Sequence, residues 1–308
     1  MSVGGPLEWI AFAAAVAVVL AVDLAAARRS ARSTLLNAAI WSGAWVGLGL
    51  AFGGWIAVRF GADAGLTYLT AFALEQSLSI DNLFVFALIF SKTGIPAALQ
   101  HRVLFWGIGG ALVMRAVMIG LGVYLLARFQ WVVYPFAALL AFAAVRMLHG
   151  GKAEQKLADA TCDLCTGWVA RFLPVSPVLD APRFLVRQNG RVMATPLLVA
   201  LIALETTDLV FAVDSIPAVL SVTRDPFLVY TSNIFALFGL RSLYFLLEGV
   251  MQRLRYLRTG LALILLFAAA KLLLVEAIEI PPVVSLLVVA CIFAGSVAAS
   301  WRSRSQTA

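Results

Sequence analysis

Long apolar runs separated by short polar connections dominate the chain. Runs of about 20 residues match the length that an α-helix needs to cross the ~30 Å hydrocarbon core of a bilayer. We expect nine such spans, near residues 7–27, 38–59, 66–91, 102–126, 130–148, 195–220, 226–250, 258–277 and 281–301. The pattern therefore predicts an all-α fold, a polytopic membrane helix bundle of about nine transmembrane helices.

Composition and charge placement agree with this pattern. The chain is 62% hydrophobic and 13% charged, whereas soluble domains are roughly half apolar. If the N-terminus lies outside, 17 of the 23 Lys and Arg residues fall in cytoplasmic connections and three in outer ones. Arg115, Arg241 and Lys271 lie inside predicted spans. The positive-inside rule then predicts a multi-pass membrane protein with its N-terminus outside and its C-terminus in the cytoplasm. We therefore attribute the net charge of +7 to membrane topology and lipid contact, and expect no nucleic-acid partner.

An internal similarity indicates a duplication. At an offset of 130 residues, Ala73-Leu74-Glu75 aligns with Ala203-Leu204-Glu205, and Pro96 aligns with Pro226. The repeat holds three spans, an odd number, so the second copy is expected to be inverted, as in many secondary transporters. Chance matching between apolar segments is the alternative.

The repeat divides the chain into five expected parts. They are two leading transmembrane helices (1–65), a first three-helix repeat (66–148), a cytoplasmic loop (149–194), a second, inverted repeat (195–277), and a final helix with a cytoplasmic tail (278–308).

Five acidic residues fall deep inside predicted spans. Glu75 and Asp81 lie in ALEQSLSIDNLFVF, and Glu205, Asp208 and Asp214 lie in ALETTDLVFAVDSIPA. An ionised carboxylate at a helix centre costs ~2.5–3.5 kcal/mol, so these groups must be protonated, paired, hydrated or bound to a cation. The three intramembrane basic residues leave two negative charges uncompensated, which matches one divalent cation or two protons. A purely structural ion-pair network is the alternative.

The ligand types indicate a hard cation. Carboxylate, amide and hydroxyl oxygens suit Mg²⁺, Ca²⁺ or Mn²⁺, and no His or Cys lies near either motif, which disfavours zinc and copper. The predicted metal ligands are Glu75, Asp81, Asn82, Glu205, Asp208 and Asp214. A second set of candidates for polar lining or counter-charge comprises Ser79, Thr207, Arg115, Asn233, Arg241 and Lys271.

Helix geometry sets a condition on this site. At 100° per residue, Glu205 and Asp208 share a face, but Asp214 lies half a turn away from Glu205. We therefore expect an interruption of the span near Ser215 to Pro217, because proline removes a backbone donor and disfavours helical geometry before it. A weaker interruption is expected around Asp81.

Four segments carry a resemblance to a known family. ALEQSLSIDNLFVFALIF, ALETTDLVFAVDSIPA, FLVRQNGRVMATPLL and DPFLVYTSNIFALFGLRSLYFLLEG resemble the bacterial TerC/Alx family of integral membrane proteins, from Val22 onward. The resemblance implies metal-ion homeostasis, with manganese export as the best-developed proposal. By position, the six predicted ligands match the residues of the family's acidic motifs, so the resemblance implies the same role for them. The family is named for tellurium resistance, but a net negative site would repel the tellurite oxyanion, so that link is expected to be indirect.

We therefore expect a secondary transporter that exports divalent cations, with manganese favoured and protons as the candidate exchange ion. Its expected partners are the bilayer and these ions, with no tightly bound cofactor and no enzymatic activity. The alternative is a non-transporting membrane scaffold or redox-associated stress factor. In that alternative the acids form a static polar core, and the function depends on Cys162 and Cys165 in the loop.

Overall fold

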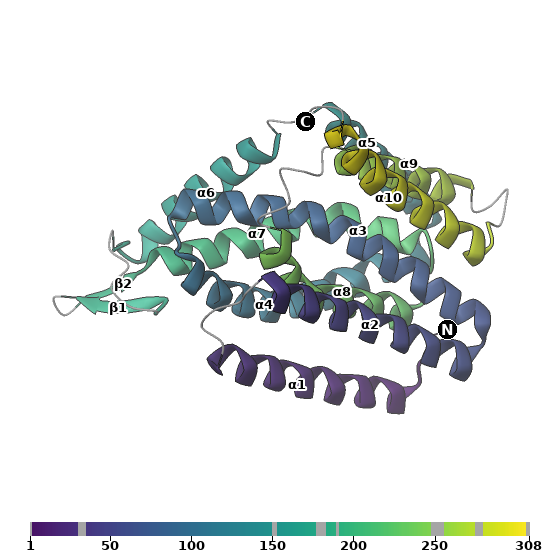
Figure 1. Ribbon diagram of the computed structural model, residues 1–308, viewed down its shortest axis with the longest axis horizontal. Coiled ribbons are helices and arrows are strands. Elements are labelled where there is room, and N and C mark those ends of the chain that lie inside the picture. Colours follow the sequence, from purple (N-terminus) through teal and green to yellow (C-terminus); the bar gives the residue numbers. More distant parts are fainter. Residues whose placement is uncertain are drawn as a thin grey trace.

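The computed structural model of this chain describes residues 2–29, 35–149, 153–176, 183–188, 191–247, 256–274 and 280–305. Within these ranges the protein is a bundle of ten α-helices with one 3₁₀ turn and one small β-hairpin (Figure 1). The elements are α1 (Pro6–Arg29), α2 (Leu35–Phe60), α3 (Ala62–Thr93), α4 (Ala97–Arg128), η1 (Gln130–Val132), α5 (Val133–His149), α6 (Ala153–Phe172), β1 (Leu185–Gln188), β2 (Arg191–Ala194), α7 (Pro196–Leu220), α8 (Pro226–Leu247), α9 (Leu257–Leu274) and α10 (Pro282–Ser305).

Each predicted span overlaps a helix in the described residues, and the parts of two spans at 248–250 and 275–277 lie outside them. Five helices in the described residues are long and apolar enough to cross a membrane, namely Leu36–Phe60, Ala62–Thr93, Ala97–Arg128, Pro196–Leu220 and Pro282–Ser300. Three shorter apolar helices cover Pro6–Val19, Val133–Leu148 and Thr259–Leu274. The helical membrane bundle is therefore confirmed, while the count of nine spans stays a prediction.

Helix α3 lies at the centre of the bundle. It packs against α2, α6, α7, α8 and α10, and 65% of its most apolar window is buried. Figure 1 shows α5, α9 and α10 gathered on one side of α3, with α1 and α2 on the other. Because α3 carries the first acidic motif, its side chains Glu75, Ser77, Ser79 and Asn82 are buried in the protein.

The two predicted repeats meet helix by helix. Helix α3 packs against α7, α4 against α8, and α5 against α9. Each helix of residues 66–148 thus contacts its expected counterpart in residues 195–277. Such pairing suits an inverted repeat, but packing alone does not establish a symmetry relation, so the repeat and the domain boundaries stay predictions.

The connection between the repeats is more structured than expected. Its described residues contain α6 and an antiparallel hairpin in which Leu185 pairs with Ala194. Helix α6 packs on α3 and α7 through a buried stripe at Ala158, Cys162, Cys165 and Val169. The spacing of this stripe, four, three and four residues, is the signal of an amphipathic helix.

The expected interruption of the sixth span is absent. Helix α7 runs unbroken from Pro196 to Leu220 with Pro217 inside it, and the Pro217 carbonyl accepts the Ser221 N–H at 2.9 Å. Proline removes one hydrogen bond near the helix end, whereas an unwound turn would leave several backbone groups unsatisfied in an apolar surrounding. The expectation of a break at Ser215 to Pro217 was wrong.

Helix α3 is likewise continuous through the first motif. The Ser77 hydroxyl donates to the Ala73 carbonyl at 2.7 Å, and Thr207 on α7 does the same to Ala203 at 2.7 Å. These hydroxyls bond back into their own helices instead of competing for the backbone donors that hold the helix. The expectation of a weaker break around Asp81 was therefore also wrong.

Candidate functional site

A buried ion-pair cluster joins four helices at the centre of the bundle. Arg115 on α4 donates from Nη1 to Glu75 Oε2 on α3 at 2.9 Å. Arg115 also donates two hydrogen bonds to Asp208 on α7, from Nη2 to Oδ1 at 3.0 Å and from Nε to Oδ2 at 3.3 Å. Asn233 on α8 donates from Nδ2 to Glu75 Oε1 at 2.7 Å. We call these four residues the ion-pair cluster.

The cluster is almost dry. The side chains of Arg115 and Glu75 are each 1% exposed, that of Asp208 is 5% exposed, and Asn233 is fully buried. A planar guanidinium that binds a carboxylate with two donors is the strongest such pairing available to proteins. Removing one partner of a buried pair leaves an uncompensated charge, at a cost of about 3–5 kcal/mol. The geometry therefore fixes α3, α4, α7 and α8 relative to one another.

Glu205 stands beside this cluster but is not part of it. Its carboxyl lies against α4, where a Cβ added to Gly110 would collide with it and one added to Gly107 would touch it at 3.8 Å. These two glycines make room for the carboxyl. Glu205 and Asp208 also border a cavity of about 20 Å³, which is room for on the order of one water molecule.

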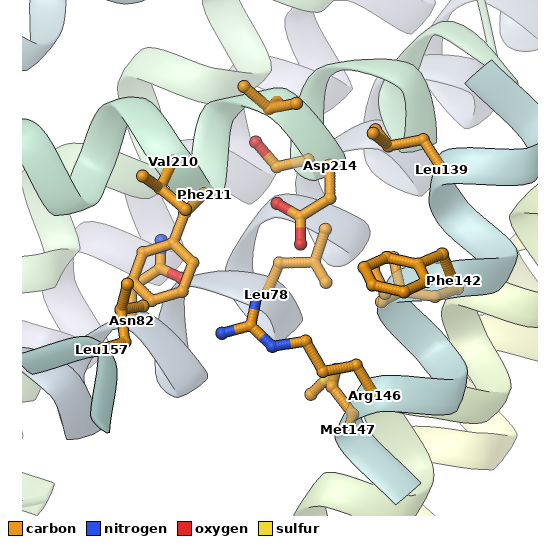
Figure 2. A pocket seen from close by; sticks show the side chains of 14 residues that line it. Leu78, Asn82, Leu139, Phe142, Arg146, Met147, Leu157, Val210, Phe211 and Asp214 are labelled. Carbon is orange, nitrogen blue, oxygen red and sulfur yellow. The ribbon is translucent and has the colours of Figure 1, made fainter. Parts of the chain in front are cut away.

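A second polar site lies between α3, α5 and α7. It is a cavity of about 190 Å³ whose polar lining consists of Asn82, Arg146, Asp214 and Ser215, among leucine, phenylalanine and other apolar side chains. Figure 2 shows the Asp214 carboxyl, the Asn82 amide and the Arg146 guanidinium turned toward the same space. We call this space the Asp214 cavity.

The Asp214 cavity has the features of a site for a small hydrophilic ligand. Its volume corresponds to on the order of six water molecules of ~30 Å³ each. Ser215 is 3% exposed, and its buried hydroxyl has no hydrogen-bond partner among the described residues. Buried hydroxyls are normally satisfied by protein, water or a ligand. An unsatisfied oxygen beside a carboxylate and an amide favours a hydrated cation as the ligand.

Comparison with known proteins defines the family. The model of the integral membrane protein TerC family matches residues 60–308, most of the chain. This chain belongs to the TerC family.

Its relatives are similar over nearly their full lengths. An uncharacterised membrane protein of Myxococcus xanthus is 44% identical over 97% of this chain and 93% of its own length. A protein of Escherichia coli strain K12, named as a candidate membrane-bound redox modulator, Alx, is 44% identical over 94% of this chain and 92% of its own. An uncharacterised membrane protein of Rickettsia bellii is 36% identical over 92% and 93% of the two chains. No solved structure matches the chain significantly.

In this TerC-family protein the five predicted ligands whose side chains the structure describes lie in three different places. Glu75 and Asp208 belong to the ion-pair cluster, Asn82 and Asp214 line the cavity, and Glu205 lies against α4. The Asp81 side chain lies outside the described residues. No group of three or more His, Cys, Asp or Glu side chains able to hold a metal ion is present in the part of the chain that the structure describes. Because α7 stays helical, Asp214 faces away from Glu205 and Asp208.

The second set of candidates is also divided. Arg115 and Asn233 complete the ion-pair cluster, while Lys271 donates to Ser285 at 2.8 Å. Arg241 lies two helical turns beyond Asn233 on α8 and does not line the Asp214 cavity. The Thr207 hydroxyl is used by its own helix, and the buried Ser79 hydroxyl has no hydrogen-bond partner within the described ranges.

Sequence reasoning missed Arg146. It was counted only as one of the basic residues in cytoplasmic connections, because it falls near the end of the fifth predicted span. Nothing in the spacing of the acidic motifs indicates that α5 brings it to Asp214. A signal was available: an arginine three residues before a helix end has a stem long enough to reach into the bundle.

The two cysteines of α6 are buried free thiols. Cys162 is 3% exposed and Cys165 is 2% exposed, and Cys165 Sγ lies 3.7 Å from the Thr206 hydroxyl of α7. Burial raises the pKa of Cys162 to about 11 and also raises the pKa of Cys165. Because the thiolate is the reactive form of cysteine, these thiols are poorly suited to redox exchange at neutral pH.

Proposed function

We propose that this TerC-family protein is a secondary transporter that exports divalent cations, with manganese the favoured ion, through the Asp214 cavity. The observation that carries the proposal is the cavity itself. It offers a carboxylate, an amide oxygen and an unsatisfied hydroxyl in a space large enough for a partly hydrated ion. Oxygen ligands of this kind suit Mn²⁺, Mg²⁺ and Ca²⁺.

The position of the cavity supports alternating access. Its ligands come from α3 and α7, the first helices of the two predicted repeats, and inverted-repeat transporters bind substrate at the repeat interface. A rocking motion of one repeat against the other would open the cavity to one side at a time. Glu205 is the candidate proton carrier for exchange, because it lies on α7 with Asp214 and outside the ion-pair cluster, whereas Arg115 and Asn233 hold both oxygens of Glu75.

We further propose that the protein resides in the bacterial cytoplasmic membrane with its N-terminus outside and its C-terminus inside. The support is the bias of Lys and Arg toward one set of connections. In this orientation the end of α5 that carries Arg146, together with α6 and the hairpin, faces the cytoplasm. The protein is expected to act without enzymatic chemistry and without a tightly bound cofactor.

The second candidate function is a membrane redox or scaffold factor. The name of the Escherichia coli relative favours it, and the buried ion-pair cluster is the static polar core that it requires. The buried, protonated state of Cys162 and Cys165 opposes a role for them in redox exchange. Transport is therefore the leading proposal.

Reconstitution in liposomes tests the choice. Mn²⁺ flux is measured for the wild type, Asp214→Asn, and a variant in which Cys162 and Cys165 are both replaced by serine. Asp63→Asn is a matched control, because Asp63 is an exposed acid in the first turn of α3. We expect flux from the wild type, the control and the double serine variant, and none from Asp214→Asn. Wild-type flux equal to that of empty liposomes would contradict transport.

A further inference from the structure

A cavity larger than the Asp214 cavity lies between α2, α3, α8 and α10. Its volume is about 380 Å³, and it shares no lining residue with the Asp214 cavity. Its polar residues are Ser42, Gln76 and Ser77, and no charged side chain is among the described residues that line it. We call it the Gln76 cavity. Pockets that bind small organic molecules have this makeup, with a volume of roughly 300–1,000 Å³ and a few polar groups in an apolar wall.

Two of the three polar side chains have no partner. Gln76 Nε2 and Ser42 Oγ are buried atoms without a hydrogen-bond partner among the described residues, and Ser42 as a whole is only 7% exposed. The Ser77 hydroxyl, by contrast, donates to the Ala73 carbonyl at 2.7 Å. The Gln76 amide lies beside α8, where a Cβ added to Gly239 would be 3.6 Å from Nε2. Because buried donors are normally satisfied by protein, water or a ligand, the cavity contains a donor that lacks its acceptor.

The depth of Gln76 narrows the class of ligand. Gln76 lies near the middle of the 32-residue helix α3, about 20 Å or more from either end at 1.5 Å per residue. Phospholipid head groups lie outside a hydrocarbon core that is ~30 Å thick, so they do not reach this depth. A water cluster is disfavoured, because each buried water needs about three hydrogen bonds and most of the wall offers none. The acceptor therefore belongs to a molecule whose polar group is soluble in the core of the bilayer.

The Gln76 cavity can be reached from the bilayer. Helices α2 and α10 both pack on α3, and Figure 1 shows them on opposite sides of it. Val46 and Leu50 of α2 line the cavity and are nevertheless exposed. The cavity thus meets the outer surface of the bundle beside α2, and in a membrane protein that surface faces lipid. A ligand dissolved in the bilayer enters sideways without passing through water.

We propose that the Gln76 cavity binds a neutral, membrane-soluble carbonyl compound of the isoprenoid-quinone type. A ring carbonyl accepts a hydrogen bond from Gln76 Nε2, a second ring oxygen accepts one from the Ser42 hydroxyl, and the apolar tail rests on the wall. Such a molecule has no charge to desolvate, and its carbonyl groups travel within the hydrocarbon core. The inference concerns binding alone, and it does not depend on cation transport because the two cavities share no lining residue.

Binding of decylubiquinone to the purified full-length protein in lipid nanodiscs tests this, followed as saturable quenching of tryptophan fluorescence. We expect Gln76→Leu to raise the apparent Kd roughly tenfold, the effect of one lost hydrogen bond, and Ser42→Ala to raise it less. Gln76→Leu is expected to fold, because it removes an unpartnered amide from an apolar wall. Thermal unfolding of each variant checks this.

Two glycines provide a matched pair of variants. Gly239→Leu places a side chain in the cavity and is expected to abolish saturable binding. Gly120→Leu on α4 is the control and should bind as the wild type does, because a side chain there meets open space. Decylbenzene, which has a ring and tail but no carbonyl, should not displace the quinone.

Three results would overturn the proposal. Equal Kd values for the wild type and Gln76→Leu, or displacement of the quinone by decylbenzene, would mean that the cavity holds only an apolar chain. Quenching of the wild type that rises without saturation would mean that decylubiquinone merely dissolves in the bilayer. An equal loss of binding in Gly239→Leu and Gly120→Leu would place the site outside the Gln76 cavity.

Discussion

The ion-pair cluster and the Asp214 cavity contain the same residue types but differ in how those residues are paired. Both take polar residues from α3 and α7, and both receive an arginine from another helix. In the cluster the arginine binds two carboxylates with three hydrogen bonds in a site that is nearly closed to solvent. In the cavity the arginine makes no such bonds among the described residues, and there is open volume beside the carboxylate.

This difference separates stability from binding. A buried charge that already has its partner has little attraction left for a substrate ion, and moving the partner would cost several kcal/mol. A carboxylate that faces open volume, as Asp214 does, has room beside it for a cation. An acidic residue in a membrane span therefore does not identify a substrate site until its partner is known.

The largest expected effect is on the cluster. Arg115→Met leaves two carboxylates buried together, which should lower the free energy of unfolding by about 3–5 kcal/mol. Thermal unfolding of the protein in detergent measures this, with Arg102→Met as a control at an exposed arginine of the same helix. Adding Glu75→Gln and Asp208→Asn to Arg115→Met should recover much of the loss. Equal unfolding temperatures for Arg115→Met and the wild type would mean that the cluster does not hold the bundle together.

A smaller effect is expected at Asn233. Asn233→Leu removes the donor to Glu75 and leaves that carboxylate oxygen unsatisfied in a buried site, at about 1–3 kcal/mol. The same thermal assay measures it, and Ser242→Ala on the same helix serves as a control at a partly exposed side chain. If both variants are destabilised equally, the bond to Glu75 contributes nothing specific.

At Asp214 we expect almost no effect on stability. Asp214→Asn keeps the shape of the side chain in a cavity with open volume, so the free energy of unfolding should change by less than about 0.5 kcal/mol. The same substitution is expected to abolish Mn²⁺ flux. Asp214 would then matter for transport and not for stability, in contrast to the residues of the ion-pair cluster. A loss of stability as large as that of Arg115→Met would place Asp214 among the structural charges.

The smallest effect is expected at α6, which packs on the two helices that carry both sites. Its thiols should resist maleimide at pH 7 in the folded protein and react fully once it is unfolded in detergent. Burial raises the pKa of Cys162 from 9.0 to about 11, so thiolate formation should rise about tenfold per pH unit up to that value. Stability from the neutral thiol is present below pH 9.0 and is lost as the pH rises through about 11. Rapid labelling at pH 7 in a Cys291→Ser background would revive the redox alternative.

The apolar pattern predicted the membrane bundle well, because each run of about 20 residues must form its own helix to satisfy its backbone. Each of the nine predicted intervals overlaps an α-helix, although residues 248–250 and 275–277 of two intervals lie outside the described residues. Helix α6 was missed because its mixed composition resembles a loop, although the Ala158, Cys162, Cys165 and Val169 stripe marks one face.

The candidate site was harder to predict than the fold. The number of intramembrane acids correctly indicated that basic partners must lie nearby, and Arg115 is one of them. Which acids Arg115 binds depends on how α3, α4 and α7 pack against one another. The interruption at Pro217 was wrong because local proline chemistry was given more weight than the cost of unwinding a helix in an apolar surrounding. The place of Arg146 in the cavity lining depends on contacts between α5 and α7, which no spacing within one motif encodes.

Anomalous X-ray scattering at the manganese edge, from crystals of the full-length protein soaked in Mn²⁺, tests the division between the two sites most directly. The account predicts a single manganese peak in the Asp214 cavity, about 2.0–2.6 Å from an Asp214 oxygen. The Arg115 bonds to Glu75 and Asp208 should remain as they are. A manganese peak between Glu75 and Asp208, with Arg115 displaced, would contradict it.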